Sequence, residues 1–349
     1  MTLPEAHGSD AMKGIFMNLD NTKRSDFVTC PRKHLNRNLR NIIGLYGSAA
    51  LRYGIGFHAC MEGFYSEIAK GGWNAGDNGI VAGAKLAQEE WNKETAKYDF
   101  NTDDYRSLPN LLSAFIRYLE VFQADEGMMQ IIEPEKVFRI LMTPNSFERE
   151  MFPGLQPFYF TGRMDLEVLL NGRPWIMEFK TTSRQLSIQV NSLHRSPQVI
   201  GYNYAARATS LLKEIPDGSL IAVHQISAYK SRTTGKWGAP KFDFTRSPQV
   251  YSNEDLANWR TGYMADAYAV QQAKAKNFYP MRLYSCYTYG ACTYVGLCEQ
   301  NAPIGEEILH NLRIDDDPWD VTKGVDHKLV VIDDCDDEYW APIQKRISQ

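Results

Sequence analysis

The sequence lacks the long apolar segments that membrane proteins carry. It contains no run of about 18 consecutive apolar residues, the length that a spanning helix needs. The first residues, MTLPEAHGSDAMKG, have neither the charged nor the apolar segment of a secretory signal. Extended low-complexity runs, which are typical of disordered chains, are also missing. We therefore expect a globular cytoplasmic protein without a membrane segment.

Cysteine is scarce, with six residues in a chain of 349. That number is too small for a disulfide scaffold of this length. Three of the six, Cys286, Cys292 and Cys298, fall in one short segment. In a reducing compartment such crowding favours metal ligation over disulfides.

An excess of positive charge is also missing, because the formal net charge is -4. The negative charge is concentrated in the tail that begins at Asp315, and the remainder of the chain is weakly basic. Overall charge therefore neither supports nor excludes nucleic-acid binding. Two basic clusters are candidates for backbone contact, and a solvated charged face explains each equally well. They are Arg32, Lys33, Arg37 and Arg40, and Lys230, Arg232, Lys236 and Lys241.

The spacing of apolar residues predicts a helical first part and a mixed middle. Helices are expected at about 25–43, 53–70, 80–97, 106–125, 197–212 and 253–276. Strands are expected at about 136–142, 158–170, 174–181, 220–230 and 241–244. This order fits an α/β fold with a mixed central sheet flanked by helices. The predicted domains are a helical region at 1–130, a core at 131–250, a helix with the cysteine segment at 251–304 and an acidic tail at 305–349.

The dipeptide Asn171-Gly172 is the strongest hairpin signal in the chain. If these two residues form the loop, Leu170 faces Arg173, and Asp165 lies directly across from Glu178. Opposed carboxylates repel each other at such a distance, and a divalent cation would offset the repulsion. Strand alternation places Lys180 on the same face as Glu178. Two carboxylates and a lysine on one face are suited to metal-assisted phosphodiester hydrolysis.

A solvated hairpin face is the alternative, because Glu-x-Lys is common in charged chains. The segments GRMDLEV, IMEFKTTS and QVIGY, however, resemble in order the RecB-type branch of the PD-(D/E)XK nucleases, which includes CRISPR-associated and AddB-type exonucleases. The resemblance implies a restriction-endonuclease-like core in which Asp165 and Glu178 are metal ligands and Lys180 is the catalytic lysine. Gln198 and Tyr202 match the Gln-x-x-x-Tyr element of the branch, and their spacing places them on one helix face.

Further residues match this branch more loosely. Gly54 and His58 resemble its Gly-x-x-x-His element, where the histidine is an additional metal ligand that would favour Mn²⁺ beside Mg²⁺. A packed histidine is the ordinary alternative. Glu135 is a further acidic residue that the core could bring near the site.

Cys30 resembles the N-terminal cysteine of iron-sulfur members of the branch. Cys286, Cys292 and Cys298 would then supply the other ligands of a 4Fe-4S cluster, with structural zinc or free thiols as alternatives. The branch usually spaces the last three cysteines as C-x₂-C-x₅-C, whereas here both gaps are five residues.

The resemblance implies a Mg²⁺- or Mn²⁺-dependent deoxyribonuclease. It further implies an exonuclease acting on DNA ends in recombination, repair or phage DNA metabolism, with a recombination or replication protein as a possible partner. One alternative is a catalytically silent DNA-binding or assembly component with the same fold. Another is a nuclease of CRISPR spacer acquisition.

Overall fold

The structure is a computed structural model that describes residues 16–101, 103–208, 215–288, 290–299, 311–321, 323 and 330–332. The chain forms two compact units, each discontinuous in sequence. The core unit comprises residues 46–136 and 163–252. The cysteine unit comprises the residues before 46, residues 137–162 and the residues from 253 onward. Among the described residues, no helix combines the length and the apolar character that crossing a bilayer requires.

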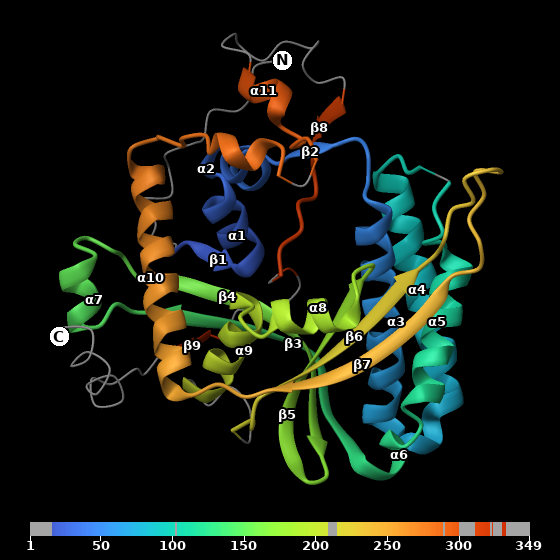
Figure 1. Ribbon diagram of the computed structural model, residues 1–349. Helices are drawn as coiled ribbons and strands as arrows, with labels where there is room; N and C mark the ends of the chain where they lie inside the picture. Colours follow the sequence, from blue (N-terminus) through green and yellow to red (C-terminus); the bar gives the residue numbers. More distant parts are fainter. Residues whose placement is uncertain are drawn as a thin grey trace. The chain divides into compact units, whose positions relative to one another are not determined.

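A mixed sheet organises the core unit, with the strand order β7-β6-β5-β4-β3 (Figure 1). Its strands are β3 (Met129–Met142), β4 (Phe158–Leu170), β5 (Arg173–Thr182), β6 (Ser219–Ser227) and β7 (Lys241–Gln249), of which β3 and β4 also extend into the cysteine unit. The pairs β4–β5 and β6–β7 are antiparallel, whereas β5 and β6 are parallel. A mixed sheet flanked by helices is the fold class that the sequence predicts.

Helices flank this sheet. They are α3 (Ala49–Gly71), α4 (Gly76–Lys97), α5 (Leu108–Val121), α6 (Asp125–Met128), α8 (Leu186–Leu193) and α9 (Pro197–Ala208). The short turn η3 (Trp73–Ala75) connects α3 to α4. The apolar face of α3 buries Phe57 and Tyr65 in one cluster with Met177 and Phe179 of β5. Removal of this apolar surface from water fixes α3 against the strand that carries Glu178 and Lys180.

The turn between β4 and β5 has the predicted form. Asn171 and Gly172 have φ angles of 52° and 75°, which a two-residue hairpin with the right-handed strand twist requires. Leu170 pairs with Arg173, and the predicted register holds as far as Leu166 and Met177. The ladder therefore ends one step before Asp165 and Glu178.

The cysteine unit contains the remaining elements. They are β1 (Asn18–Asp20), α1 (Asn21–Thr29), α2 (Pro31–His34), η2 (Leu35–Leu39), β2 (Ile42–Gly44), α7 (Ser146–Met151), α10 (Asn253–Ala275), η4 (Leu283–Cys286), α11 (Val295–Glu299), β8 (Leu312–Ile314) and β9 (Val330–Ile332). Strand β1 pairs with the start of β4, and β9 pairs with the end of β3. A ring cluster of Phe138, Phe160, Trp259 and Tyr263 packs α10 on these strands. Most of the predicted acidic tail lies outside the described residues.

The continuous helix expected at 25–43 is wrong. Helix α1 begins at Asn21, where Asp20 accepts a hydrogen bond from the Lys23 N–H, and it ends at Cys30 with φ -163°. Pro31 has no N–H to continue the helix, so that a new helix starts there. The cap at Asp20 and the break at Pro31 outweigh the helical spacing of the basic residues.

Candidate active site

Asp165 and Glu178 lie at the point where β4 and β5 separate. The Phe179 backbone N–H donates to Asp165 Oδ2 at 2.7 Å, so the side chain takes the place of a strand partner. Asp165 is 9% exposed and Glu178 1% exposed. Burial raises the pKa of Glu178, and repulsion from Asp165 raises it further. The structure therefore brings the two predicted acids together without a direct ladder pair between them.

Lys180 joins Glu178 to the helix that follows the hairpin. Its Nζ donates to Glu178 Oε1 at 2.7 Å and to the Gln198 side-chain oxygen at 3.3 Å. The Gln198 amide nitrogen donates to the same Glu178 oxygen at 3.1 Å and to Tyr202 Oη at 3.0 Å. Gln198 and Tyr202 are one turn apart on α9, so both reach the sheet from one helix face. The four residues form one connected network.

His58 lies on α3 and approaches Asp165, which is on β4. Its Nδ1 lies 3.4 Å from Asp165 Oδ1. One turn earlier on α3, a Cβ on Gly54 would lie 3.1 Å from Thr181 Oγ1, tighter than ordinary contact. The glycine thus allows α3 to approach β5 closely enough for His58 to reach Asp165. This packing accounts for both residues of the Gly-x-x-x-His spacing.

The pKa values of the two acids are shifted in opposite directions. Burial and then repulsion from Asp165 raise the pKa of Glu178 to about 7. Burial alone would also raise the pKa of Asp165, but the attraction of His58 and Lys180 and the Phe179 N–H hold it below its usual value. Burial lowers the pKa of Lys180. The attraction of Glu178 and Asp165 outweighs this effect, so the pKa of the ammonium group is raised. Asp165 is therefore ionised and Lys180 protonated at neutral pH, with Glu178 near its midpoint.

One carboxylate oxygen of the site is suited to bind a divalent cation, although the described side chains do not form a complete set of ligands. Glu178 Oε2 is buried without a hydrogen-bond partner among the described residues, although a buried carboxylate oxygen ordinarily has one. A cation beside this oxygen would satisfy it. Within the described parts of the chain, no three His, Cys, Asp or Glu side chains already converge as a metal group. Lys180 instead pairs with Glu178, and His58 Nδ1 lies beside Asp165.

Two neighbours of the site, Glu62 and Arg163, were not predicted, whereas Glu135 was expected as an acidic residue near it. Arg163 Nε lies 2.7 Å from Glu135 Oε2, and Glu135 has an unusual φ of 51°. Burial and repulsion from Asp165 raise the pKa of Glu135 to about 9, and burial raises that of Glu62. Glu62 is one helical turn after His58, a spacing that could have indicated it. No sequence signal indicates that Arg163 turns toward Glu135.

The four candidate cysteines of the cysteine unit lie within electrostatic range of one another. Burial raises the pKa of Cys286, and Cys292 and Cys30 raise it further. Burial also raises the pKa of Cys298. Arg32 lowers this pKa, whereas the other three thiols raise it further. None of these four cysteines forms a disulfide. The fold thus gathers residues that are more than 250 positions apart, as the Arg282 N–H contact to Cys30 Sγ at 3.5 Å illustrates.

Comparison with known proteins identifies one family. Residues 21–299 match the model of the PD-(D/E)XK nuclease superfamily. No curated protein matches the chain. Among solved structures, "Crystal structure of SSO0001" matches at 11% identity over 82% of this chain and 87% of that one, with a TM-score of 0.29. A similarity that low indicates neither fold nor function.

Proposed function

Because the chain belongs to the PD-(D/E)XK nuclease superfamily, we propose that it is a Mg²⁺- or Mn²⁺-dependent deoxyribonuclease that degrades DNA from its ends. The observation that carries the proposal is the buried, unpartnered Glu178 Oε2 in a network with Lys180 and beside Asp165. Lys180 and Gln198 both donate to Glu178 Oε1, so Oε2 is the oxygen at which a cation would bind.

Asp165, Glu178 and His58 would hold the cation. When bound, it would lower the pKa of a coordinated water and polarise a phosphoryl oxygen. Lys180, positively charged and 20% exposed, would orient the attacking water or stabilise negative charge that develops on the phosphate. Gln198 would act as a positioning residue, since its amide holds both Lys180 and Glu178.

Digestion of linear and circular DNA, single- and double-stranded, tests this activity. Asp165→Asn and Lys180→Ala should abolish or strongly reduce Mg²⁺- or Mn²⁺-dependent degradation. Glu89→Gln and Lys85→Ala, two exposed charges on α4, serve as matched controls and should retain it. Degradation of linear but not circular DNA would support end-directed action. Equal degradation by wild type and both site variants would overturn the proposal.

We also propose that Cys30, Cys286, Cys292 and Cys298 hold a 4Fe-4S cluster, with zinc as the alternative. The Arg282 N–H contact to Cys30 Sγ brings the N-terminal cysteine to the C-terminal segment, and Cys292 and Cys298 pack against one apolar cluster of the same unit, which supports a shared ligand. Cys292 N–H also donates to the Cys286 carbonyl at 2.7 Å, which keeps this segment folded on itself.

Anaerobic purification tests the cluster. A brown protein with a broad visible absorption band and stoichiometric iron and sulfide would support it. Cys286→Ser should remove the colour, whereas Cys60→Ala, at a buried cysteine of the core unit, should keep it. A colourless protein that contains zinc would decide for the alternative.

A further inference from the structure

A basic hairpin tip extends from the sheet of the core unit. Strands β6 and β7 are joined by residues 228–240, drawn in yellow in Figure 1. Gly238 N–H donates to the Tyr229 carbonyl at 2.8 Å, and Ser231 N–H to the Lys236 carbonyl at 2.9 Å. The turn closes at Gly235, whose φ of 67° suits glycine. The tip is therefore a hydrogen-bonded extension of the two strands.

The base of the tip is fixed to the segment before α5. Lys230 Nζ lies 2.6 Å from Asp103 Oδ2, and Trp237 Nε1 donates to the Asp103 carbonyl at 3.3 Å. The Trp237 ring packs on Tyr105 with centroids 4.8 Å apart. These contacts hold the tip in place, so its outer side chains lose little freedom when they bind a ligand.

The outer side chains of the tip are unpaired cations. Arg232 and Lys236 are exposed, and neither side chain has a partner among the described residues. No acidic residue occurs between Tyr229 and Lys241. An exposed pair of cations with no acid in the same turn attracts a polyanion.

The other basic cluster differs in this respect. Lys33 and Arg37 pair with the buried Asp26, at 2.8 and 3.3 Å. Arg32 donates to the Tyr279 carbonyl at 2.9 Å. That cluster therefore serves the packing of the cysteine unit, and its charges are largely neutralised.

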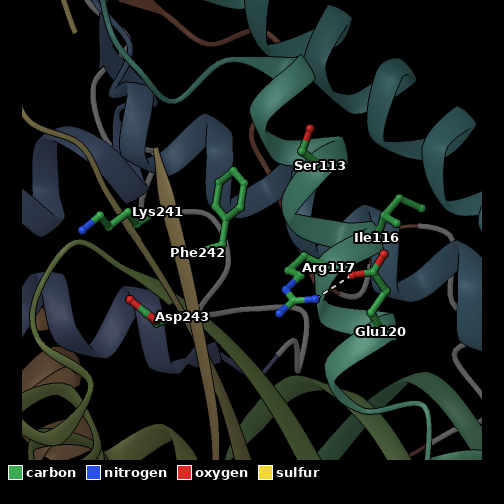
Figure 2. A pocket seen from close by; sticks show the side chains of 7 residues that line it. All are labelled: Ser113, Ile116, Arg117, Glu120, Lys241, Phe242 and Asp243. Atoms are coloured by element: carbon green, nitrogen blue, oxygen red, sulfur yellow. Dashed lines mark hydrogen bonds and ion pairs between the residues drawn. The ribbon is translucent and has the colours of Figure 1, made fainter. Parts of the chain in front are cut away.

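The hollow beside β7 is also balanced in charge. It lies between α5 and β7, and Figure 2 shows Phe242 on the α5 side of the strand with Lys241 and Asp243 on the other. Arg117 pairs with Glu120 at 2.8 Å within it. Acid and base thus alternate here, which leaves the tip as the anion-attracting part of this hairpin.

Strand register connects the tip to the active site. Glu178 and Lys180 pair with Ile221 and Val223 of β6, so side chains at alternate positions from Ile221 to Ser227 lie on the same sheet face as the catalytic residues. From Val223 to Lys230 the chain advances roughly 23 Å at ~3.3 Å per residue. The spacing of about 3.4 Å between phosphates of one strand applies along the axis of a duplex, and an extended single strand spans this length with only a few nucleotides.

We infer that Arg232 and Lys236 bind the phosphate backbone of a DNA strand a few nucleotides from the scissile phosphate. This inference rests on the proposed function, because the strand held by the tip is the one that the site cleaves. The tip would add affinity for long strands, and strands too short to reach it would bind without its help.

Fluorescence anisotropy without divalent metal tests the inference with labelled single strands of about 3 and about 25 nucleotides. Arg232→Ala/Lys236→Ala should weaken binding of the long strand about tenfold and lower its salt slope by about 1.4, the value for two phosphate contacts. Binding of the short strand should not change. Lys70→Ala/Lys85→Ala, which removes the same charge from α3 and α4, is the matched control and should bind as wild type.

Equal affinity and salt slope of the tip variant and the control on the long strand would overturn the inference. An equal loss on long and short strands would also overturn it, because it would indicate a general charge effect. Failure of the proposed function is a separate result. In that case wild type does not cleave DNA, whereas the binding comparison still reports on the tip.

Discussion

Glu178 is a residue of the proposed site whose ionisation the fold opposes. Its pKa is about 7, above the value of about 4.3 expected in an unfolded chain. Because the folded value is raised, the stabilisation is fully present below the unfolded pKa and is lost as pH rises through the folded one. We expect the metal-free protein to lose on the order of 1–3 kcal/mol of unfolding free energy between about pH 5 and 8.

Urea denaturation with a chelator present, across this pH range, measures the effect. Glu178→Gln should flatten the profile, and Mg²⁺ or Mn²⁺ should restore stability at the upper end, because a ligand that binds the folded state stabilises it. Glu135, whose pKa is about 9, adds to the loss over the same range because its carboxyl ionises near pH 4.3 in the unfolded chain, so Glu178→Gln should reduce the slope without removing it. A profile of the same slope in the variant would contradict the assignment.

Gln198 tests whether the hydrogen-bond network positions the lysine. Its oxygen accepts from Lys180 and its nitrogen donates to Glu178, so Gln198→Ala should lower kcat by about 10–100-fold, as loss of supporting partners does at metal sites. KM should change little, because Gln198 holds the site and not the substrate. Gln189→Ala, which removes a contact to Thr182 two residues beyond the lysine, is the control. Equal kcat in the two variants would argue for a packing role alone.

The site residues differ in how far the sequence could predict them. Asp165, Glu178 and Lys180 follow from a turn with a fixed register, a local rule that needs no tertiary contact. Their spatial association with His58 follows from helix packing, which the Gly54 spacing indicates only through a resemblance. Arg163 and Glu135 approach each other through the unusual backbone angle at Glu135, which no local preference predicts.

At the scale of elements, the β4–β5 turn sets the geometry of the site. Gly172 has a φ of 75°, and a Cβ there would meet no atom within 4 Å. Gly172→Ala should therefore cost only backbone strain, about 1–2 kcal/mol of unfolding free energy. Gly172→Asn should cost less, since Asn tolerates this conformation. Urea midpoints of the two variants check the order, and an equal loss would show that the side chain acts through contacts instead.

Element boundaries were predictable where a local signal ends the element. Strand β4 agrees with its prediction at both ends, because the hairpin dipeptide stops it. The first strand of the core begins at Met129 and not near Lys136, and α8 was not predicted at all. Helix α8 packs on β6 and β7 after the catalytic strand, so its formation depends on a sheet surface that the local sequence does not reveal.

At the scale of the whole molecule, the chain passes repeatedly between two units. The described strands β3 and β4 each contribute residues to both. The contiguous domains predicted at 1–130, 131–250, 251–304 and 305–349 stay a prediction. Spatial units of this kind cannot be derived from composition, because a long strand has the same periodicity whichever neighbours it meets.

Each unit has its own buried ion pair. In the core unit, Arg246 makes two contacts to Asp125, at 2.7 and 2.6 Å, and also donates to Tyr118 Oη. In the cysteine unit, Arg260 holds both oxygens of Glu148 at 2.9 Å. Removing one partner of such a pair leaves a buried charge and typically costs about 3–5 kcal/mol.

We expect Asp125→Asn to destabilise the core unit and Glu148→Gln to destabilise the cysteine unit. Hydrogen exchange should show early loss of protection in α5 and β7 for the first variant, and in α7 and α10 for the second, because local opening follows the contacts that are lost. Asp243→Asn, at an exposed position of β7, is the control and should leave the pattern unchanged. If both ion-pair variants lost protection uniformly along the described chain, the two units would unfold as one cooperative body. The prediction of a loss confined to one unit would then be wrong.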